Sequence, residues 1–367
     1  MFLKNIRLEN FRNYDALHLD FNSRLVFFVG DNGSGKTNII EAISMLSYLK
    51  SFRDNTDSEI LSWGKNTYYI RTDFEESDMD HRIEIGFEKA IQSRKKVKFD
   101  NEVLKKKSGI VGKIITVIFS PGDLHIINGG PAERRRFIDS FISSVNPDYL
   151  NNLIEYNKIL KNRNTLLKKH SERSAISVWD TMLINAGEKI IEERNIFIQE
   201  LNHFFKKDIL ELSGDKDKFE LFYQPNVADA VLFQEKLEKN IARDYKLGYT
   251  SSGIHRDMLF IGENGKDVTE FASQGQKRST VISLKTSAFK IIRDKYNRLP
   301  VLLIDDVIRE LDVKRREYFI NLIYNCGQAF FTTTDLEGIH DYIGNLEEQK
   351  QVFFVSKGKV MEQIEKN

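Results

Sequence analysis

The chain has 367 residues, enough for two lobes with a sizeable core. Lys and Arg total 55 against 54 Asp and Glu, so the overall charge indicates no class of partner and local charge must be examined instead. The single cysteine, Cys326, excludes an intramolecular disulfide and a thiolate zinc cage. No apolar run approaches the roughly 18 residues that span a bilayer, and no signal peptide is evident, so we expect no membrane contact. A single thiol fits a reducing compartment, and we expect a cytoplasmic protein.

The first third of the chain has the short apolar runs and the period-two alternation of β-strands, which is clearest over residues 81–87. A helix is expected after residue 37. The expected strands cover residues 2–8, 16–20, 25–29, 67–74, 82–88, 95–99 and 114–119.

Residues 30–37 read Gly-Asp-Asn-Gly-Ser-Gly-Lys-Thr, a complete G-x-x-x-x-G-K-[ST] phosphate loop. An apolar strand precedes it and a helical pattern follows, so the helix N-terminus would face the phosphates. Lys36 adds a positive charge, and the Thr37 hydroxyl suits Mg²⁺. The expected ATP-binding residues are Gly30, Asp31, Asn32, Gly33, Ser34, Gly35, Lys36 and Thr37.

Helical periodicity replaces strand periodicity from about residue 131 to 212. Strands return at 219–223 and 257–261, and the chain then alternates between helices (277–292, 311–325) and strands (301–304, 329–333) before a hairpin near 352–361. We therefore predict an α/β protein in which 1–125 and 245–367 form one discontinuous lobe. Residues 126–244 would be an inserted, mainly helical lobe.

Residues 300–306 read Pro-Val-Leu-Leu-Ile-Asp-Asp, an apolar strand that ends in two carboxylates. In a phosphate-loop protein this is the Walker B pattern, in which Asp305 holds Mg²⁺ beside the phosphates. Asp306 would then orient or deprotonate the attacking water. The expected catalytic residues are Asp306 and Lys36.

A second anion site is expected where Ser273, Gln274, Gly275 and Gln276 precede a helical run. The order of phosphate loop, insertion, this stretch and the Asp-Asp strand is that of ABC-type ATPases. That resemblance implies that the second site acts in trans, in a homodimer that clamps two ATP molecules. Residues 310–312 then resemble the D-loop at the dimer interface, and residues 332–335 the switch that senses the γ-phosphate.

Several stretches in this order resemble the RecF family of bacterial recombination mediators nearly end to end. They are residues 8–14 (Leu-Glu-Asn-Phe-Arg-Asn-Tyr), 51–53 (Ser-Phe-Arg), 119–124 (Phe-Ser-Pro-Gly-Asp-Leu), 130–139 and 252–257 (Ser-Gly-Ile-His-Arg-Asp). The sequence departs from the family pattern at Gly122, Ile254, Met258 and Arg309. Arg309, in the D-loop, either weakens the clamp or replaces a lost contact with phosphate.

The resemblance implies a P-loop ABC/SMC-type ATPase head that dimerises with ATP on DNA. It also places Arg12 and Asn13 at the ATP. Members of the family recognise duplex next to single strand at gaps, hydrolyse ATP slowly with stimulation by DNA, and help RecA to load together with RecO and RecR.

Residues 89–113 carry nine Lys or Arg and only two acids, a composition that suits contacts to DNA phosphates. A second basic stretch holds Lys158, Lys161, Arg163, Lys168, Lys169 and Arg173; both stretches could instead be ordinary solvated surface. The expected DNA contacts are Arg94, Lys95, Lys96, Lys105, Lys106 and Lys107.

Other ATPases share parts of this pattern. A transporter subunit, an ABC-type ATPase with a different partner, usually lacks the long basic insertion. SMC arms need far longer heptad runs, and an OLD-type nuclease needs more than the thirty or so residues that follow Asp335. A scaffold that binds ATP without hydrolysis is disfavoured by the two carboxylates at 305 and 306.

Overall fold

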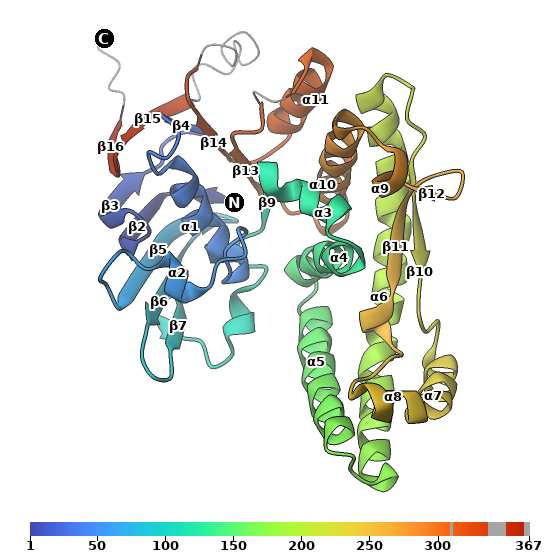
Figure 1. Ribbon diagram of the computed structural model, residues 1–367. Coiled ribbons are helices and arrows are strands. Elements are labelled where there is room, and N and C mark those ends of the chain that lie inside the picture. Colours follow the sequence, from blue (N-terminus) through green and yellow to red (C-terminus); the bar gives the residue numbers. More distant parts are fainter. Residues whose placement is uncertain (309–310, 337–349, 363–367) are drawn as a thin grey trace. The chain divides into compact units, whose positions relative to one another are not determined.

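A computed structural model describes residues 1–308, 311–336 and 350–362 (Figure 1). The chain forms two compact units: unit 1 comprises Met1–Asp123 and Ile292–Asn367, and unit 2 comprises Leu124–Ile291. The sequence analysis assigned 245–291 to the ATPase lobe, but here this segment belongs to unit 2. Its strand β11 (Met258–Glu263) pairs with β10 (Glu220–Gln224), so the two segments share one sheet.

A parallel sheet forms the centre of unit 1, in the order β16-β15-β4-β14-β13-β9. Only β16 runs antiparallel to its neighbour. All residues of β4, β13 and β14 are buried, which explains why these strands are continuous apolar runs. The strands are β4 (Leu25–Val29), β9 (Thr116–Phe119), β13 (Val301–Asp305), β14 (Ala329–Thr333), β15 (Lys350–Ser356) and β16 (Lys359–Glu362).

A second, antiparallel sheet in unit 1 has the order β3-β2-β5-β6-β7-β8, with β1 beside β5. Apolar side chains from both sheets and from α1 (Lys36–Tyr48) form one core, in which Ile43, Ile70 and Phe330 are completely buried. The strands are β1 (Phe2–Leu3), β2 (Asn5–Phe11), β3 (Tyr14–Asp20), β5 (Thr67–Glu76), β6 (Met79–Glu88), β7 (Arg94–Phe99) and β8 (Glu102–Val103). Unit 1 also contains α2 (Asp57–Ile60) and α11 (Val313–Tyr324).

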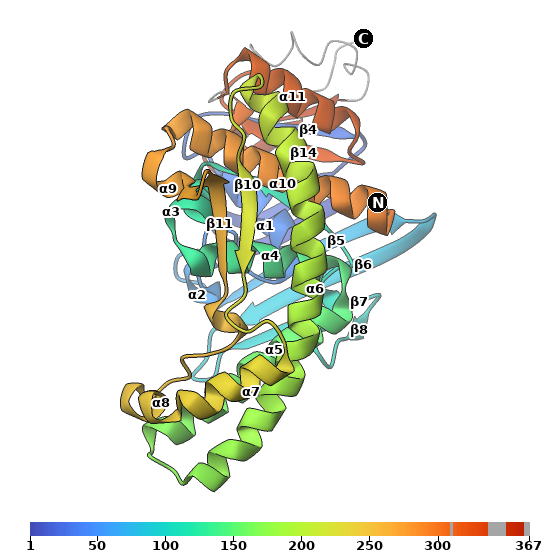
Figure 2. The same cartoon turned by 90° about the vertical axis from the view of Figure 1, so that its right-hand side faces the viewer.

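Unit 2 is built around α6 (Arg173–Ser213), a single long helix (Figure 2). Both views show α5, α7 and α8 gathered at one end of α6, with β10 and β11 running along it. Unit 2 also contains α3 (His125–Asn128), α4 (Pro131–Val145), α5 (Pro147–Lys168), α7 (Ala230–Lys239), α8 (Ile241–Leu247), β12 (Lys266–Asp267), α9 (Val268–Phe271) and α10 (Gln274–Tyr296) as far as Ile291. No helix among the described residues is long and apolar enough to cross a membrane.

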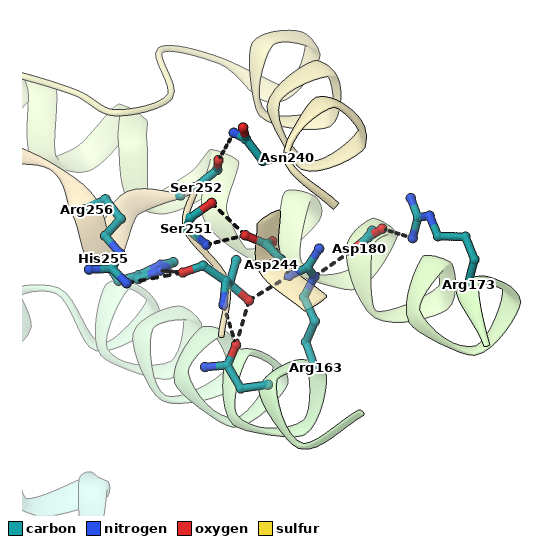
Figure 3. Close-up of polar contacts among 12 residues, drawn as sticks. Arg163, Arg173, Asp180, Asn240, Asp244, Ser251, Ser252, His255 and Arg256 are labelled. Carbon is teal, nitrogen blue, oxygen red and sulfur yellow. Dashed lines mark hydrogen bonds and ion pairs between the residues drawn. The ribbon is translucent and has the colours of Figure 1, made fainter. Parts of the chain in front are cut away.

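A buried arginine joins three elements at that end of α6 (Figure 3). Arg163 of α5 is completely buried; its Nε donates to Asp180 Oδ1 at 2.6 Å and its Nη1 to Asp244 Oδ2 at 2.8 Å. The same Nη1 also donates to Thr250 Oγ1 at 2.8 Å. The prediction that Arg163 is a surface cation is therefore wrong. Position 163 follows Tyr156 and Ile159 at helical spacing, on the face of α5 that is buried.

Arg163→Ala should lower the free energy of unfolding by about 3–5 kcal/mol, because it leaves the completely buried Asp244 carboxylate without its cation and leaves Asp180 with only the exposed Arg173. Denaturant unfolding followed by the emission of Trp179, next to Asp180 in α6, measures this loss. Lys161→Ala, an exposed position on the same helix, is the matched control and should change stability by less than about 0.5 kcal/mol. Equal effects of the two substitutions would contradict the account.

His255 is held neutral in the same region. Its Nε2 lies 3.0 Å from the Thr250 carbonyl, which can only accept, so Nε2 carries the proton. Its Nδ1, 2.8 Å from the Tyr156 hydroxyl, is then the acceptor. Burial lowers the pKa of His255 to about 4, and the charges of Arg256 and Arg135 act in the same direction.

The lowered pKa predicts a loss of stability in mild acid. Between pH 6.5 and pH 4 the unfolded chain binds a proton at His255 that the folded chain rejects, so the free energy of unfolding falls as pH falls. The slope from this one group reaches about 1.4 kcal/mol per pH unit. In His255→Gln this part of the slope should vanish. Unfolding curves of both proteins from pH 7 to pH 4.5 that stay parallel would refute the assignment.

Candidate nucleotide site

The phosphate loop joins β4 to α1, as the sequence predicts. Gly33 and Gly35 have φ angles of +79° and +119°, which favour glycine. A Cβ at Gly35 would lie 2.5 Å from Asn13 Nδ2 and 2.6 Å from Tyr14 Oη. The loop can therefore keep this shape only with glycine at position 35.

The Lys36 side chain folds back over its own loop. Its Nζ donates to the carbonyl oxygens of Gly30 at 2.6 Å and Asp31 at 2.9 Å, and the residue is buried. These contacts hold the ammonium group at the loop, where an anion could replace the carbonyl oxygens as its partner.

Three oxygen-bearing side chains converge beside the loop. Thr37 Oγ1 donates to Asp305 Oδ1 at 2.7 Å, and Thr332 Oγ1 donates to the same oxygen at 2.8 Å. Asp305 and Thr332 are register partners in the parallel pair of β13 and β14, so both lie at the carboxyl edge of the sheet. Burial raises the pKa of Asp305 and the Asp306 charge raises it further, whereas the two hydroxyl groups oppose the shift. Hard oxygen ligands of this kind suit Mg²⁺.

Asp306, immediately after β13, has a strained backbone. Its φ of +51° is in the left-handed region, at a cost of about 1–3 kcal/mol. Its N–H donates to Thr332 Oγ1 at 3.0 Å, which links it to the Asp305 cluster. Within the described ranges, Asp306 Oδ1 is buried and has no hydrogen-bond partner. A carboxyl oxygen in that state is available to a ligand or water.

Two more buried oxygens beside the loop lack partners. Tyr14 Oη and Ser34 Oγ make no hydrogen bond to any residue that the structure describes. Buried polar groups are nearly always paired, so orphaned groups around a loop of this kind fit a bound polar ligand. The donor chemistry therefore fits a nucleotide with Mg²⁺.

Arg12 and Asn13, which the family resemblance places at ATP, lie at the rim of the loop. Asn13 Nδ2 donates to the Ser34 carbonyl at 3.2 Å. Arg12 donates through Nε and Nη2 to both carboxyl oxygens of Glu41, at 2.8 and 2.6 Å. Glu41 is completely buried in α1. Its pairing orients the Arg12 guanidinium, and contact of Arg12 with ATP stays a prediction.

Two residues near the loop were not predicted from the sequence. The first is Glu41, which pairs with Arg12, although a carboxylate among apolar helix residues was an available signal. The second is Gly358, in the turn between β15 and β16, whose N–H donates to the Ser34 carbonyl at 3.1 Å. Nothing in the local sequence around Gly358 points to the loop, because more than 300 residues separate them.

Unit 2 carries the second predicted anion site, at the start of α10. Ser273 N donates to Gln276 Oε1 at 2.9 Å and Gln276 N donates to Ser273 Oγ at 3.3 Å. This reciprocal pair is a capping box, which fixes the helix start. Ser273 and Gln274 are exposed, whereas Gly275 and Gln276 are half-buried.

The predicted D-loop and switch are described only in part. Arg309 and Glu310 lie outside the described residues. Asp312 caps α11 by accepting from Arg315 N at 3.0 Å, and Leu311 is buried. In the switch, Thr332 binds Asp305, and Thr333 Oγ1 donates to the Asp335 carbonyl at 2.7 Å.

All but one of the predicted DNA-binding cations are exposed. The exposed ones are Arg94, Lys96, Lys105, Lys106 and Lys107. Lys95 is not available: its Nζ contacts Asp57 Oδ1 at 2.5 Å and donates to the Leu49 carbonyl at 2.7 Å. Burial lowers the pKa of Lys95, against the effect of Asp57. In β7 the side chains alternate, so Lys95 turns inward while its two neighbours face solvent.

The two family-like stretches of unit 2 meet at one buried side chain. Arg194 of α6 contacts both carboxyl oxygens of Asp139 at 2.9–3.0 Å and Asp257 Oδ2 at 2.8 Å. Asp257 is completely buried and also accepts from the Tyr223 hydroxyl at 2.5 Å. These stretches therefore have a structural role, since they tie α4, α6 and the segment that leads into β11 together.

Comparison with known proteins agrees with this geometry. A family model described as "RecF/RecN/SMC N terminal domain" matches residues 2–361. The "DNA replication and repair protein RecF" of Leptospira interrogans (strain Fiocruz L1-130) is 55% identical over 361 residues, covering 98% of this chain and 99% of that protein. The protein of the same description from Leptospira biflexa (strain Patoc 1 / Ames) is 51% identical over 362 residues, 98% of each chain.

The chain is also similar to solved structures of RecF proteins. A structure described as the "recombination mediator protein RecF-ATP in RecFOR pathway" superposes with a TM-score of 0.90 at 32% identity, covering 99% of this chain and 98% of that one. An Smc head domain from Pyrococcus furiosus, at 16% identity and a TM-score of 0.55, shows the shared fold alone. The chain has the α/β fold of ABC/SMC-type ATPase heads and belongs to the RecF family of DNA replication and repair proteins.

Proposed function

We propose that this chain binds ATP and Mg²⁺ at residues 30–37, hydrolyses ATP slowly, and acts on gapped or junction DNA in recombinational repair. The observation that carries the proposal is the meeting of Thr37, Asp305 and Thr332 beside the phosphate loop. A relative described as bound to ATP supports the choice of nucleotide.

Each residue of the site has a distinct role in this proposal. Lys36 exchanges its carbonyl partners for phosphate oxygens, and the loop N–H groups bind the rest of the triphosphate. Thr37 and Asp305 would hold Mg²⁺, which neutralises phosphate charge when bound. Asp306, with its unpartnered oxygen, positions the attacking water and accepts its proton. Its strained backbone is a geometry that active sites commonly retain.

The start of α10 completes the site from a second copy of the chain. Its capping box leaves Ser273 and Gln274 exposed at a helix N-terminus, where an anion binds favourably. An isologous dimer would hold two ATP molecules, each between the loop of one copy and the Ser273 helix of the other. ATP would thereby control dimer formation.

DNA contact in this proposal comes from Arg94, Lys96 and Lys105–Lys107, which are exposed cations of unit 1. Cations of this kind contact phosphates without reading the base sequence.

RecO and RecR are proposed partners because a close structural relative is described within the RecFOR pathway. The outcome would be support for RecA loading at gaps.

Lys36→Ala should weaken ATP binding about 100-fold, since one or two hydrogen bonds to charged phosphate oxygens disappear. Binding of a fluorescent ATP analogue measures the effect. Lys50→Ala, an exposed lysine that follows the same helix, is the matched control and should bind normally. Equal affinity of the Lys36 and Lys50 variants would exclude Lys36 from the site.

Asp306→Asn should keep ATP affinity within about twofold yet slow hydrolysis at least about 100-fold, because the proton acceptor is lost. Asp305→Asn is the informative contrast: it should weaken Mg²⁺-dependent ATP binding itself. Single-turnover hydrolysis and equilibrium binding on both variants separate the two roles. Normal turnover in the Asp306 variant would refute its assignment.

A further inference from the structure

Two loops lie side by side at one end of the antiparallel sheet of unit 1. Residues 61–66 lead into β5, and residues 89–93 join β6 to β7. The Lys89 N–H donates to the Asn66 carbonyl at 2.7 Å, which connects the loops directly. Thr67 and Glu88 are register partners, as are Glu88 and Arg94, so the loops emerge from adjacent strands. We call residues 61–66 and 88–96 the β5–β7 tip.

A tryptophan stands at this tip with its side chain entirely in solvent. Trp63 is 100% exposed, and Ile91 in the neighbouring loop is also fully exposed. The turn beneath Trp63 is nevertheless well anchored: Ser62 is buried, and its N–H donates to the Asn10 carbonyl at 3.0 Å. Lys65 N donates back to the Ser62 carbonyl at 3.0 Å, and Gly64 takes the positive φ of +75° that such a turn requires. The indole thus contributes nothing to the core although its backbone is fixed.

The tip also carries an excess of positive charge. The tip holds four exposed cations, Lys65, Lys89, Arg94 and Lys96, and one exposed acid, Glu88. As far as the chain is described, none of these four cations takes part in an ion pair or a side-chain hydrogen bond. They are therefore available to an anionic partner, and their excess over acids favours one.

We propose that the β5–β7 tip binds single-stranded DNA, with Trp63 stacked on an unpaired base and the four cations on the adjacent phosphates. Proteins that bind single strands without sequence preference combine aromatic side chains, on which bases stack, with cations that contact the backbone phosphates. A blunt duplex offers the phosphates but no free base face along its length. Stacking on the indole would therefore favour single-stranded DNA over duplex DNA. The inference rests on the proposed action on DNA and assigns recognition of the single strand to named residues.

A protein partner is the competing occupant, because Trp and Arg are also enriched in protein interfaces. Trp63 and Ile91 are the large exposed apolar side chains of the tip, which also holds four exposed cations. Protein interfaces are depleted of Lys at their core, whereas phosphate-binding surfaces are enriched in it. The charge pattern therefore favours nucleic acid.

The test uses the full chain carrying Trp179→Phe. The chain has two tryptophans, so this substitution leaves Trp63 as its single tryptophan. A single-stranded thymidine oligonucleotide should quench Trp63 emission, and a blunt duplex of equal length should not. Trp63→Ala should weaken binding of the single strand about tenfold while duplex affinity stays within about twofold. Trp63→Phe, which keeps an aromatic face, should recover most of the affinity.

Two results would overturn the inference. The first is that the single-stranded oligonucleotide leaves Trp63 emission unchanged, and that the wild-type and Trp63→Ala proteins bind it with equal affinity. The other is self-association in sedimentation that Trp63→Ala abolishes, which would assign the tip to a protein interface. If duplex DNA and ATP still bind while the single strand has no effect, only this inference fails. If no DNA binds at all, the proposed function fails with it.

Discussion

One carboxylate oxygen organises the candidate nucleotide site. Asp305 Oδ1 accepts hydrogen bonds from Thr37 at the end of the phosphate loop and from Thr332 on the neighbouring strand. This meeting depends on the register of the parallel sheet, in which Asp305 lies directly opposite Thr332. A slip of one residue would turn every side chain of the strand to the other face. The burial of β4, β13 and β14 on both faces therefore fixes the register that places Asp305 beside Thr332, as well as the packing of the core.

The helical unit depends on buried charge rather than on apolar packing alone. Arg163 and Arg194 are buried, and each holds two aspartates from separate elements. Buried ion pairs of this kind contribute little net stability compared with apolar packing, but removal of one partner is costly. We infer that they fix how α5, α6 and the segment around Asp257 fit together. The geometry of the unit is then specified by a few hydrogen-bonded contacts.

The sequence predicts the parts of the site that depend on local pattern. The phosphate loop, the Asp305-Asp306 strand and the Ser273 helix start are each contiguous motifs, and the structure has a loop, a strand end and a helix start at these places. Side-chain direction was harder to predict. Lys95 and Arg163 looked like surface cations, but one faces inward in a strand and the other lies on the buried stripe of a helix. Their charge gave no sign of this, because the partners Asp57 and Asp244 are distant in sequence.

Long-range contacts explain what else was missed. The Gly358 turn reaches the phosphate loop only because β15 pairs with β4 in the sheet. Residues 245–291 pack with the helical unit because β10 and β11 share a sheet, although the motif order of ABC-type ATPases groups them with the ATPase lobe. In both cases the deciding contact joins segments whose local sequences carry no common signal.

The proposed function requires each nucleotide to be held between the loop of one copy and the Ser273 helix of another. The most direct measurement is ATP hydrolysis by an equimolar mixture of Lys36→Ala and Ser273→Arg chains on gapped DNA. Each variant alone has no intact composite site, whereas the mixed dimer has one. The mixture should therefore regain a substantial fraction of the wild-type activity per dimer. A mixture as inactive as its two components would contradict the proposed arrangement.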